Sequence, residues 1–150
     1  MNYEVYSGIK ANDDFSVFKF ISTGPKGKIQ KSVAFMPTEN PSIFDLGLAD
    51  LIGEKAIPDD QVVSDNGDRN KVLATVAQIT IMYTMAYPQR WVYFEGSTAA
   101  RTRLYRIAIH LNLDELSSHF DIFGVLEDGQ SERFEPGQHY QGFLVRRKKQ

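Results

Sequence analysis

The stretch Val72–Pro88, VLATVAQITIMYTMAYP, decides the fold, because it carries no charged residue. Its apolar side chains wrap almost fully around a helical wheel, which is typical of a helix buried within a domain. It reaches only the lower limit of transmembrane length and is diluted by four polar side chains, Thr75, Gln78, Thr80 and Thr84. We therefore predict a central buried helix and no membrane span.

Turn and capping signals set the bounds of this helix. Asn66-Gly67 is a turn, and Asp68 is a plausible N-cap for a helix over Arg69–Ala86. Pro88 follows the last turn. We expect the helix to be the centre of the core, so that a carboxylate at Val76 would unfold the protein.

The chain before the helix is predicted to be β-structure. FSVFKFIST (15–23) and KIQKSVAFM (28–36) flank Gly24-Pro25-Lys26-Gly27, which predicts a hairpin. The next segment, NPSIFDLGLADLIGEKAIPDDQ (40–61), is broken by glycine and proline, and there we expect at most a short helix.

The chain after the helix alternates between both types of element. We predict a strand over Arg90–Glu95, a helix from a Ser97 or Thr98 cap to about Asn112, and strands in HFDIFGVL (119–126) and HYQGFLVRR (139–147). A short piece near Arg133 lies between the last two. The prediction is one α+β domain over 1–150, with a mostly antiparallel sheet on two helices in the order β-β-α-β-α-β-β, and a basic C-terminal tail, 146–150.

Composition limits the classes of function. The chain has 150 residues, 42% hydrophobic and 24% charged, with a formal net charge of −2. This balance argues against a broadly basic nucleic-acid-binding surface. The absence of cysteine excludes disulfides and thiolate chemistry and fits a reducing compartment. The first residues lack a secretory signal pattern, so we expect a cytoplasmic protein.

The second helix begins with an unusual concentration of positive charge. The sequence EGSTAARTRLYR (95–106) places three arginines in the first turns, where the positive end of the helix dipole repels them. Helical geometry puts Ala100, Leu104, Ile107, Ala108 and Leu111 on a core face, with Arg101 and Arg103 on opposite flanks and Arg106 directed away. A negative partner is needed.

Two kinds of partner would satisfy the arginines. A phosphate or carboxylate ligand could bind the helix-start N–H groups, the Ser97 and Thr98 hydroxyls, and Arg101 or Arg103, with Gly96 allowing close approach to the backbone. The ligand would be a phosphate-bearing small molecule or nucleic acid. Alternatively, the arginines are structural and pair with carboxylates of this chain, namely Asp59, Asp60, Asp65 and Asp68.

An enzymatic interpretation remains as a third alternative. The run VYFEGSTAAR (92–101) resembles the opening of the nucleotidyltransferase pattern, in which a later pair of carboxylates holds Mg²⁺. Asp121 is the only candidate here, and Phe123 stands where the second carboxylate would be. His110, His119 and His139 lack metal-ligand spacing, so we predict no metal and no cofactor.

Three motifs together resemble a known family. These are TGPKGKIQKSVAF (23–35), SDNGDRNKVLATVA (64–77) and GSTAARTRLYRIAI (96–109). The chain is similar over most of its length to a family of small uncharacterised bacterial proteins. The resemblance implies a single small domain and assigns no reaction and no catalytic residue. A binding module, an enzyme of phosphoryl chemistry and an interaction protein with structural arginines therefore all stay open.

Overall fold

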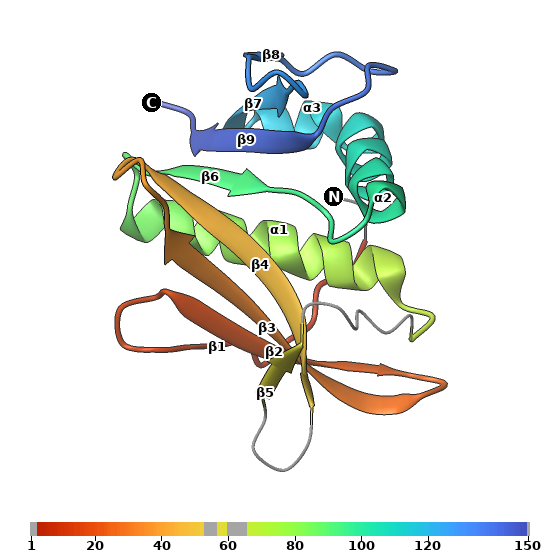
Figure 1. Cartoon of the computed structure of the whole chain (residues 1–150). Coiled ribbons are helices and arrows are strands. Elements are labelled where there is room, and N and C mark those ends of the chain that lie inside the picture. Colours follow the sequence, from red (N-terminus) through yellow and green to blue (C-terminus); the bar gives the residue numbers. More distant parts are fainter. Residues whose placement is uncertain (1–2, 53–56, 60–65, 150) are drawn as a thin grey trace. The chain divides into compact units, whose positions relative to one another are not determined.

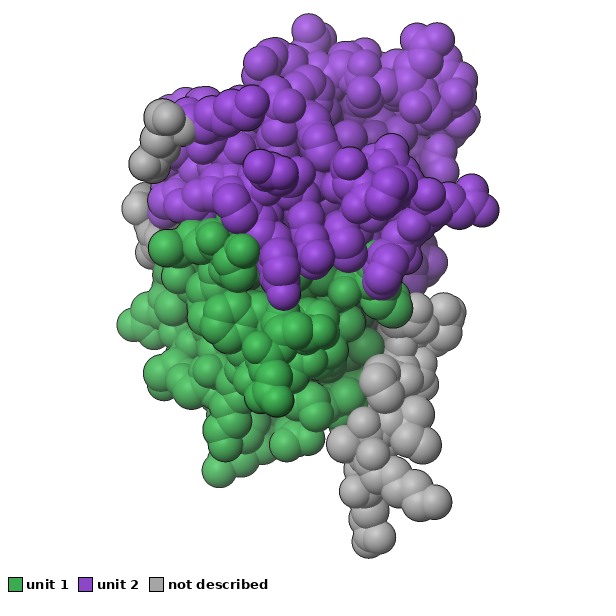
Figure 2. Space-filling model, turned by 90° about the vertical axis from the view of Figure 1, so that its left-hand side faces the viewer, with its two compact units in different colours: residues 1–36, 46–86 green, residues 37–45, 87–150 purple. Residues whose placement is uncertain are grey.

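The computed structural model describes residues 3–52, 57–59 and 66–149 (Figure 1). These residues form nine strands and three helices, and the predicted α+β class is confirmed. The chain divides into two compact units, coloured separately in Figure 2. Unit 1 comprises residues 1–36 and 46–86, and unit 2 comprises residues 37–45 and 87–150. The single domain over 1–150 stays a prediction.

Unit 1 contains the predicted hairpin. Its strands follow the order β1-β2-β3-β4, and β5 pairs with β4. The predicted two-residue turn is confirmed, since Gly24 of β2 lies opposite Gly27 of β3 in an antiparallel ladder. The bounds are β1 Lys10–Ala11, β2 Val17–Gly24, β3 Gly27–Pro37, β4 Ile43–Ile52 and β5 Ile57–Asp59.

Strand β4 corrects the prediction for the segment 40–61. A broken segment with at most a short helix was expected, but Ile43–Ile52 forms one continuous strand through Gly47. Its first residues pair in parallel with β6 (Trp91–Phe94), and its last residues pair with β5. The pairing with β6 joins residues distant in sequence, so local glycine and proline signals cannot reveal it.

The core of unit 1 lies between the hairpin and helix α1 (Arg69–Ala86), which has the predicted bounds. Phe18 and Phe20 of β2 and Val33 and Phe35 of β3 are buried. The Phe35 ring stacks on Tyr83 of α1, with centroids 3.8 Å apart and planes within 2°. Alternating residues of each strand thus bury one face against the helix.

Helix α1 buries part of its circumference rather than all of it. Ile79 and Tyr83 are fully buried, whereas Met85 is 62% exposed and Val76 is only half-buried. The expectation of burial on every side was therefore wrong, and Val76 is a poor site for testing it. Three buried threonines satisfy their hydroxyls by donating to carbonyl oxygens one turn earlier in the helix: Thr75 to Lys71, Thr80 to Val76 and Thr84 to Thr80, at 2.7–2.8 Å.

Among the described residues, no helix is both long enough and apolar enough to cross a lipid bilayer. The three threonines of α1 are buried, with their hydroxyls bonded to the helix backbone.

Unit 2 is built on strands in the order β4-β6-β9-β7-β8. Strand β6 runs antiparallel to β9, and β9 and β8 each run antiparallel to β7. The bounds are β7 Phe120–Val125, β8 Ser131–Arg133, β9 Gly142–Arg147, α2 Ala99–Leu111 and α3 Leu113–Ser117. The prediction missed α3 and the early strands β1, β4 and β5.

Two details of unit 2 differ from the prediction. The expected basic tail over 146–150 begins later, because Arg146 and Arg147 belong to β9. The expected core face of α2 is also wrong: Ile107 is 38% exposed and Leu111 68%, whereas Ile109 is buried. Tyr105 packs edge-on against Phe94 of β6, with centroids 5.9 Å apart. Tyr105 therefore contributes to the packed face of α2, which the spacing of the aliphatic residues alone does not predict.

Candidate functional site

A pocket of about 710 Å³ opens at the start of helix α2, within unit 2. It lies where β6 and β7 have ended and β9 has not yet begun. Three segments line it: residues 95–100, 102, 103 and 106 at the start of α2, Glu127, and residues 139–141. Pockets of this size commonly hold small-molecule ligands. The lining includes Gly96, Ser97, Thr98 and Arg103 of the predicted site, and also Arg106, which was expected to point away from the core.

The helix begins as the sequence predicts. Thr98 has extended backbone angles, and its Oγ1 accepts a hydrogen bond from the Arg101 N–H at 3.2 Å. The Thr98 carbonyl oxygen accepts from the Thr102 N–H at 3.0 Å. Thr98 is therefore the N-cap. Among the described residues, the N–H groups of Ala99 and Ala100 meet no acceptor, which leaves them for solvent or a ligand.

Gly96 is required by the fold of this turn. A Cβ atom at position 96 would lie 2.4 Å from the Thr102 nitrogen and 2.6 Å from the Arg101 carbonyl carbon. The Gly96 N–H donates to Thr102 Oγ1 at 2.9 Å, which holds the loop against the first helical turn. We expected this glycine to let a ligand approach the backbone, but the first helical turn of α2 itself makes the close approach.

Arg101 binds the turn that precedes its own helix. Its guanidinium donates to Ser97 Oγ, and its backbone N–H donates to Thr98 Oγ1. Both hydroxyl oxygens therefore accept a hydrogen bond from Arg101, and each hydroxyl keeps its own proton to donate. Arg101 itself is not among the pocket-lining residues.

Arg103 and Arg106 both line the pocket, and neither has an acidic partner among the described residues of unit 2. Arg103 is exposed and Arg106 is half-buried, with a long hydrogen bond of 3.4 Å to the Gln138 carbonyl oxygen. Among the described residues of unit 2, no carboxylate lies within ion-pair distance of Arg101, Arg103 or Arg106. Arg103 and Arg106 are three residues apart on the helix, and this spacing could have predicted that both side chains line the same pocket.

Two carboxylates share this pocket with the arginines. Glu95 lies directly after β6, and Glu127 lies 3.8 Å from the Nε2 atom of His139, an ion pair when the imidazole is protonated. The charge of Glu95 also acts on the neighbouring Tyr93. Burial first, and then the charges of Glu95 and Asp45, raise the pKa of Tyr93 to about 12. Sequence analysis did not identify Glu127 or His139, because only the fold brings their loops to α2.

The predicted acidic partners of the arginines are mostly beyond what the structure describes. Asp60 and Asp65 lie outside the described residues, as does the side chain of Asp59 in β5. Asp68 belongs to unit 1, where its carboxylate accepts from the hydroxyls of Tyr6 and Ser22. Pairing between this acidic segment and Arg101 or Arg103 stays a prediction.

Asp121 has arginine partners on the sheet of unit 2. It lies on β7 and accepts from Arg146 Nε at 3.2 Å, with Arg133 3.9 Å away. It is not among the pocket-lining residues. The described residues also contain no group of three or more His, Asp or Glu side chains arranged to hold a metal ion. Nothing in this geometry adds the second carboxylate that the enzymatic alternative needs.

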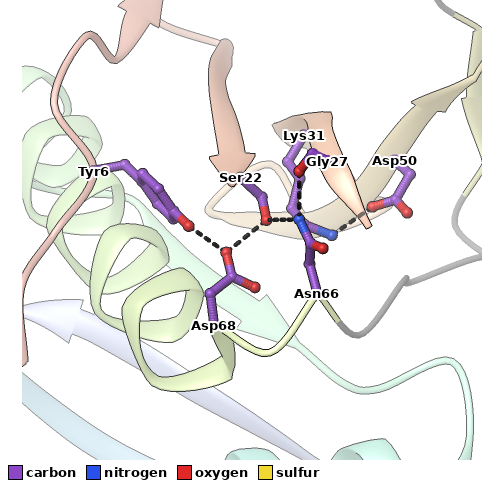
Figure 3. A network of polar contacts seen from close by, with 7 residues as sticks. All are labelled: Tyr6, Ser22, Gly27, Lys31, Asp50, Asn66 and Asp68. Carbon is purple, nitrogen blue, oxygen red and sulfur yellow. Dashed lines mark hydrogen bonds and ion pairs between the residues drawn. The ribbon is translucent and has the colours of Figure 1, made fainter. Parts of the chain in front are cut away.

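A second polar cluster lies inside unit 1 and includes Asn66 and Asp68 of the second motif (Figure 3). The Asn66 amide donates to the Gly27 carbonyl oxygen at 2.9 Å and to Ser22 Oγ at 3.2 Å. Its Oδ1 accepts from the Lys26 N–H at 2.7 Å. Ser22 in turn donates to Asp68 at 2.5 Å. Asn66 and Ser22 are buried, so this cluster fastens the hairpin to the start of α1 and is closed to a ligand.

Asp68 begins α1 with its backbone and uses its side chain for a different contact. Its carbonyl oxygen accepts the helical hydrogen bond from the Val72 N–H at 2.9 Å. Its carboxylate binds the hydroxyls of Tyr6 and Ser22 from the preceding chain. A charge-assisted hydrogen bond of this kind is stronger than one between neutral groups. Asp68 thus marks the helix start while holding the hairpin and the N-terminal segment in place.

The comparisons with known proteins support one part of the resemblance, the membership of a family of unknown function. No curated protein and no solved structure matches the chain. A family model, described as a family of unknown function (DUF6934), matches residues 2–148 and so includes all three motifs. The chain belongs to this family of unknown function.

Proposed function

We propose that unit 2 binds an anionic ligand, through a phosphate or carboxylate group, in the pocket at the start of α2. The observation that carries this proposal is the presence of Arg103 and Arg106 on one pocket wall, without a carboxylate partner among the described residues of their unit. Clustered guanidinium groups that are not neutralised attract anions and can bind them with charge-assisted hydrogen bonds.

The polar groups beside these arginines support the same ligand class. Ser97 and Thr98 line the pocket, and their hydroxyls accept from Arg101 while each keeps a proton to donate. The first N–H groups of α2 add the positive end of the helix dipole. In this proposal Gly96, Ser97, Thr98 and Arg103 contact the ligand, while Arg101 positions Ser97. We also propose a cytoplasmic location, which rests on the cysteine-free composition.

The binding-module interpretation is preferred to the enzymatic one. The phosphoryl-transfer alternative requires a carboxylate pair that can hold a metal, and Asp121 is engaged by Arg146 and Arg133. A non-catalytic site requires only the donors already gathered at the pocket. The proposal therefore concerns binding and assigns no reaction.

The test is a titration of the protein with inorganic phosphate, nucleotides and short RNA, followed by thermal shift and calorimetry. We expect Arg103→Gln and Arg106→Gln each to weaken binding about tenfold or more, equivalent to about 1.4 kcal/mol. Arg133→Gln is the matched control, because this guanidinium lies in the same unit and outside the pocket lining. Wild-type protein unaffected by every anion, or pocket variants that bind like the control, would overturn the proposal.

A further inference from the structure

The pocket at the start of α2 holds charges of both signs that do not neutralise one another. Arg103 and Arg106 contribute two positive charges, and Glu95 and Glu127 contribute two negative ones. Among the described residues of unit 2, neither arginine forms an ion pair with either glutamate, and His139 is the group that approaches Glu127. Opposite charges lining one pocket without pairing leave both sets available to a ligand.

The two carboxylates differ in their place in unit 2: Glu95 directly precedes Gly96, whereas Glu127 lies in the loop after β7. The donors belong to the turn before α2 and to its first two turns. The acceptors Glu95 and Glu127 follow the ends of β6 and β7, respectively. Both carboxylates are exposed, so each is open to a hydrogen-bond donor of the ligand.

We infer that the ligand is a phosphate ester of nucleotide size that also carries an amino group. This inference rests on the proposed anion site and adds the second recognition element. The phosphate binds Arg103, Arg106 and the helix start, and the amino group donates to Glu95 or Glu127. A volume of about 710 Å³ accommodates a ligand much larger than phosphate alone. A carboxylate accepting from an exocyclic amine is the established way to read cytosine, and adenine carries an equivalent amine.

The inference predicts discrimination between ligands that differ in a single group. Cytidine monophosphate has an amine where uridine monophosphate has a carbonyl oxygen, and the phosphate and sugar are the same. A carbonyl oxygen would face a carboxylate with no proton between them. We expect the wild-type protein to bind cytidine monophosphate at least about tenfold more tightly than uridine monophosphate. Adenosine monophosphate should exceed inosine monophosphate by a similar factor.

Calorimetric titration of the full chain with both nucleotide pairs tests this. Glu95→Gln with Glu127→Gln should remove the preference within each pair while inorganic phosphate still binds. Asp114→Asn, on the surface helix α3, is the control for loss of one negative charge. Circular dichroism melting checks that each variant is folded, and the wild-type comparison needs no variant.

Each outcome assigns the failure to one proposal. Equal affinity for the amino and carbonyl members of both pairs, with phosphate binding intact, would overturn this inference and leave the anion site standing. A preference that survives the double substitution would overturn the role of the two glutamates. Failure to bind any nucleotide or phosphate would overturn the anion site and this inference together.

Discussion

Asn66 lies directly against Gly24: a Cβ atom at position 24 would stand 1.9 Å from the Asn66 carbonyl oxygen. Asn66 is 1% exposed, and its side-chain amide spans the hairpin turn, from Lys26 to Gly27. Asn66 of the second motif therefore packs directly against the hairpin turn Gly24–Gly27 of the first motif.

The first prediction follows from this contact. Gly24→Ala should destabilise the protein by at least about 2 kcal/mol, since the methyl group meets backbone that cannot move alone. Gly47→Ala is the control, because the nearest neighbour of a Cβ there is the flexible end of Met36 at 3.9 Å. Chemical denaturation compares the two. Equal stability of both variants would show that the hairpin and the SDNGD motif are not in tight contact.

The second prediction concerns the side chains of α1. Ile79→Ala should cost about 2–5 kcal/mol, because this residue is fully buried and its truncation leaves a cavity. Met85→Ala, on a side chain 62% exposed, should change stability by no more than about 0.5 kcal/mol. The free energies of unfolding from urea titrations check both values. A large effect at Met85 would mean that its surface is covered in solution.

The third prediction concerns the ion pair inside the core of unit 1. Lys31 Nζ lies 2.6 Å from Asp50 Oδ1, and the two side chains are 1% and 2% exposed (Figure 3). Lys31→Met should cost about 3–5 kcal/mol, because it leaves a buried carboxylate without its ammonium partner. The double variant with Asp50→Leu should recover part of that loss. A double variant whose loss equals the sum of the two single losses would exclude direct coupling between the pair.

The fourth prediction is a pH dependence at Tyr93. Its pKa in the folded protein is raised to about 12, above the ordinary value near 10, so the folded state retains the phenolic proton longer than the unfolded state. The contribution of Tyr93 to stability is therefore complete below pH 10 and is lost as the pH rises from about 10 to about 12.

Absorbance titration at alkaline pH measures this directly. Tyr93→Phe should remove one late-ionising phenol from the curve, and its stability should fall less between pH 10 and 12 than that of the wild type. Tyr105 and Tyr140 also have pKa values raised by burial, so the difference between variant and wild type is the informative quantity. A Tyr93→Phe curve that lacks an early-ionising phenol instead would contradict the assignment.

Local signals in the sequence were sufficient for much of the fold. Asn66-Gly67 and Pro88 bounded α1, and Thr98 marked the start of α2, because caps and turns depend on neighbouring residues. The strand Ile43–Ile52 was missed, since its glycine breaks the local pattern and its pairing with β6 joins residues distant in sequence. The predicted core face of α2 was wrong for a similar reason, because the packing of Tyr105 against Phe94 is a contact between separate elements.

The candidate site was predictable only in part. Gly96, Ser97, Thr98 and Arg103 form one continuous motif, so sequence analysis placed them together and the pocket contains them. Glu127 and His139 reach the same pocket from loops that have no sequence signal of their own. The position of Glu127 and His139 at the pocket depends on the pairing of β7 with β9, which the local sequence does not predict.

The chain alternates between the two units, and this limits how a gene can be divided between them. The backbone passes from unit 1 to unit 2 after residue 36, returns after residue 45, and enters unit 2 again after residue 86. Strand β4 itself contributes residues to both units. A break after residue 86 keeps all of unit 1 but separates residues 37–45 from the rest of unit 2, so no single breakpoint in the gene divides the chain into two intact units. A family model that extends over residues 2–148, and thus over both units, agrees with this arrangement.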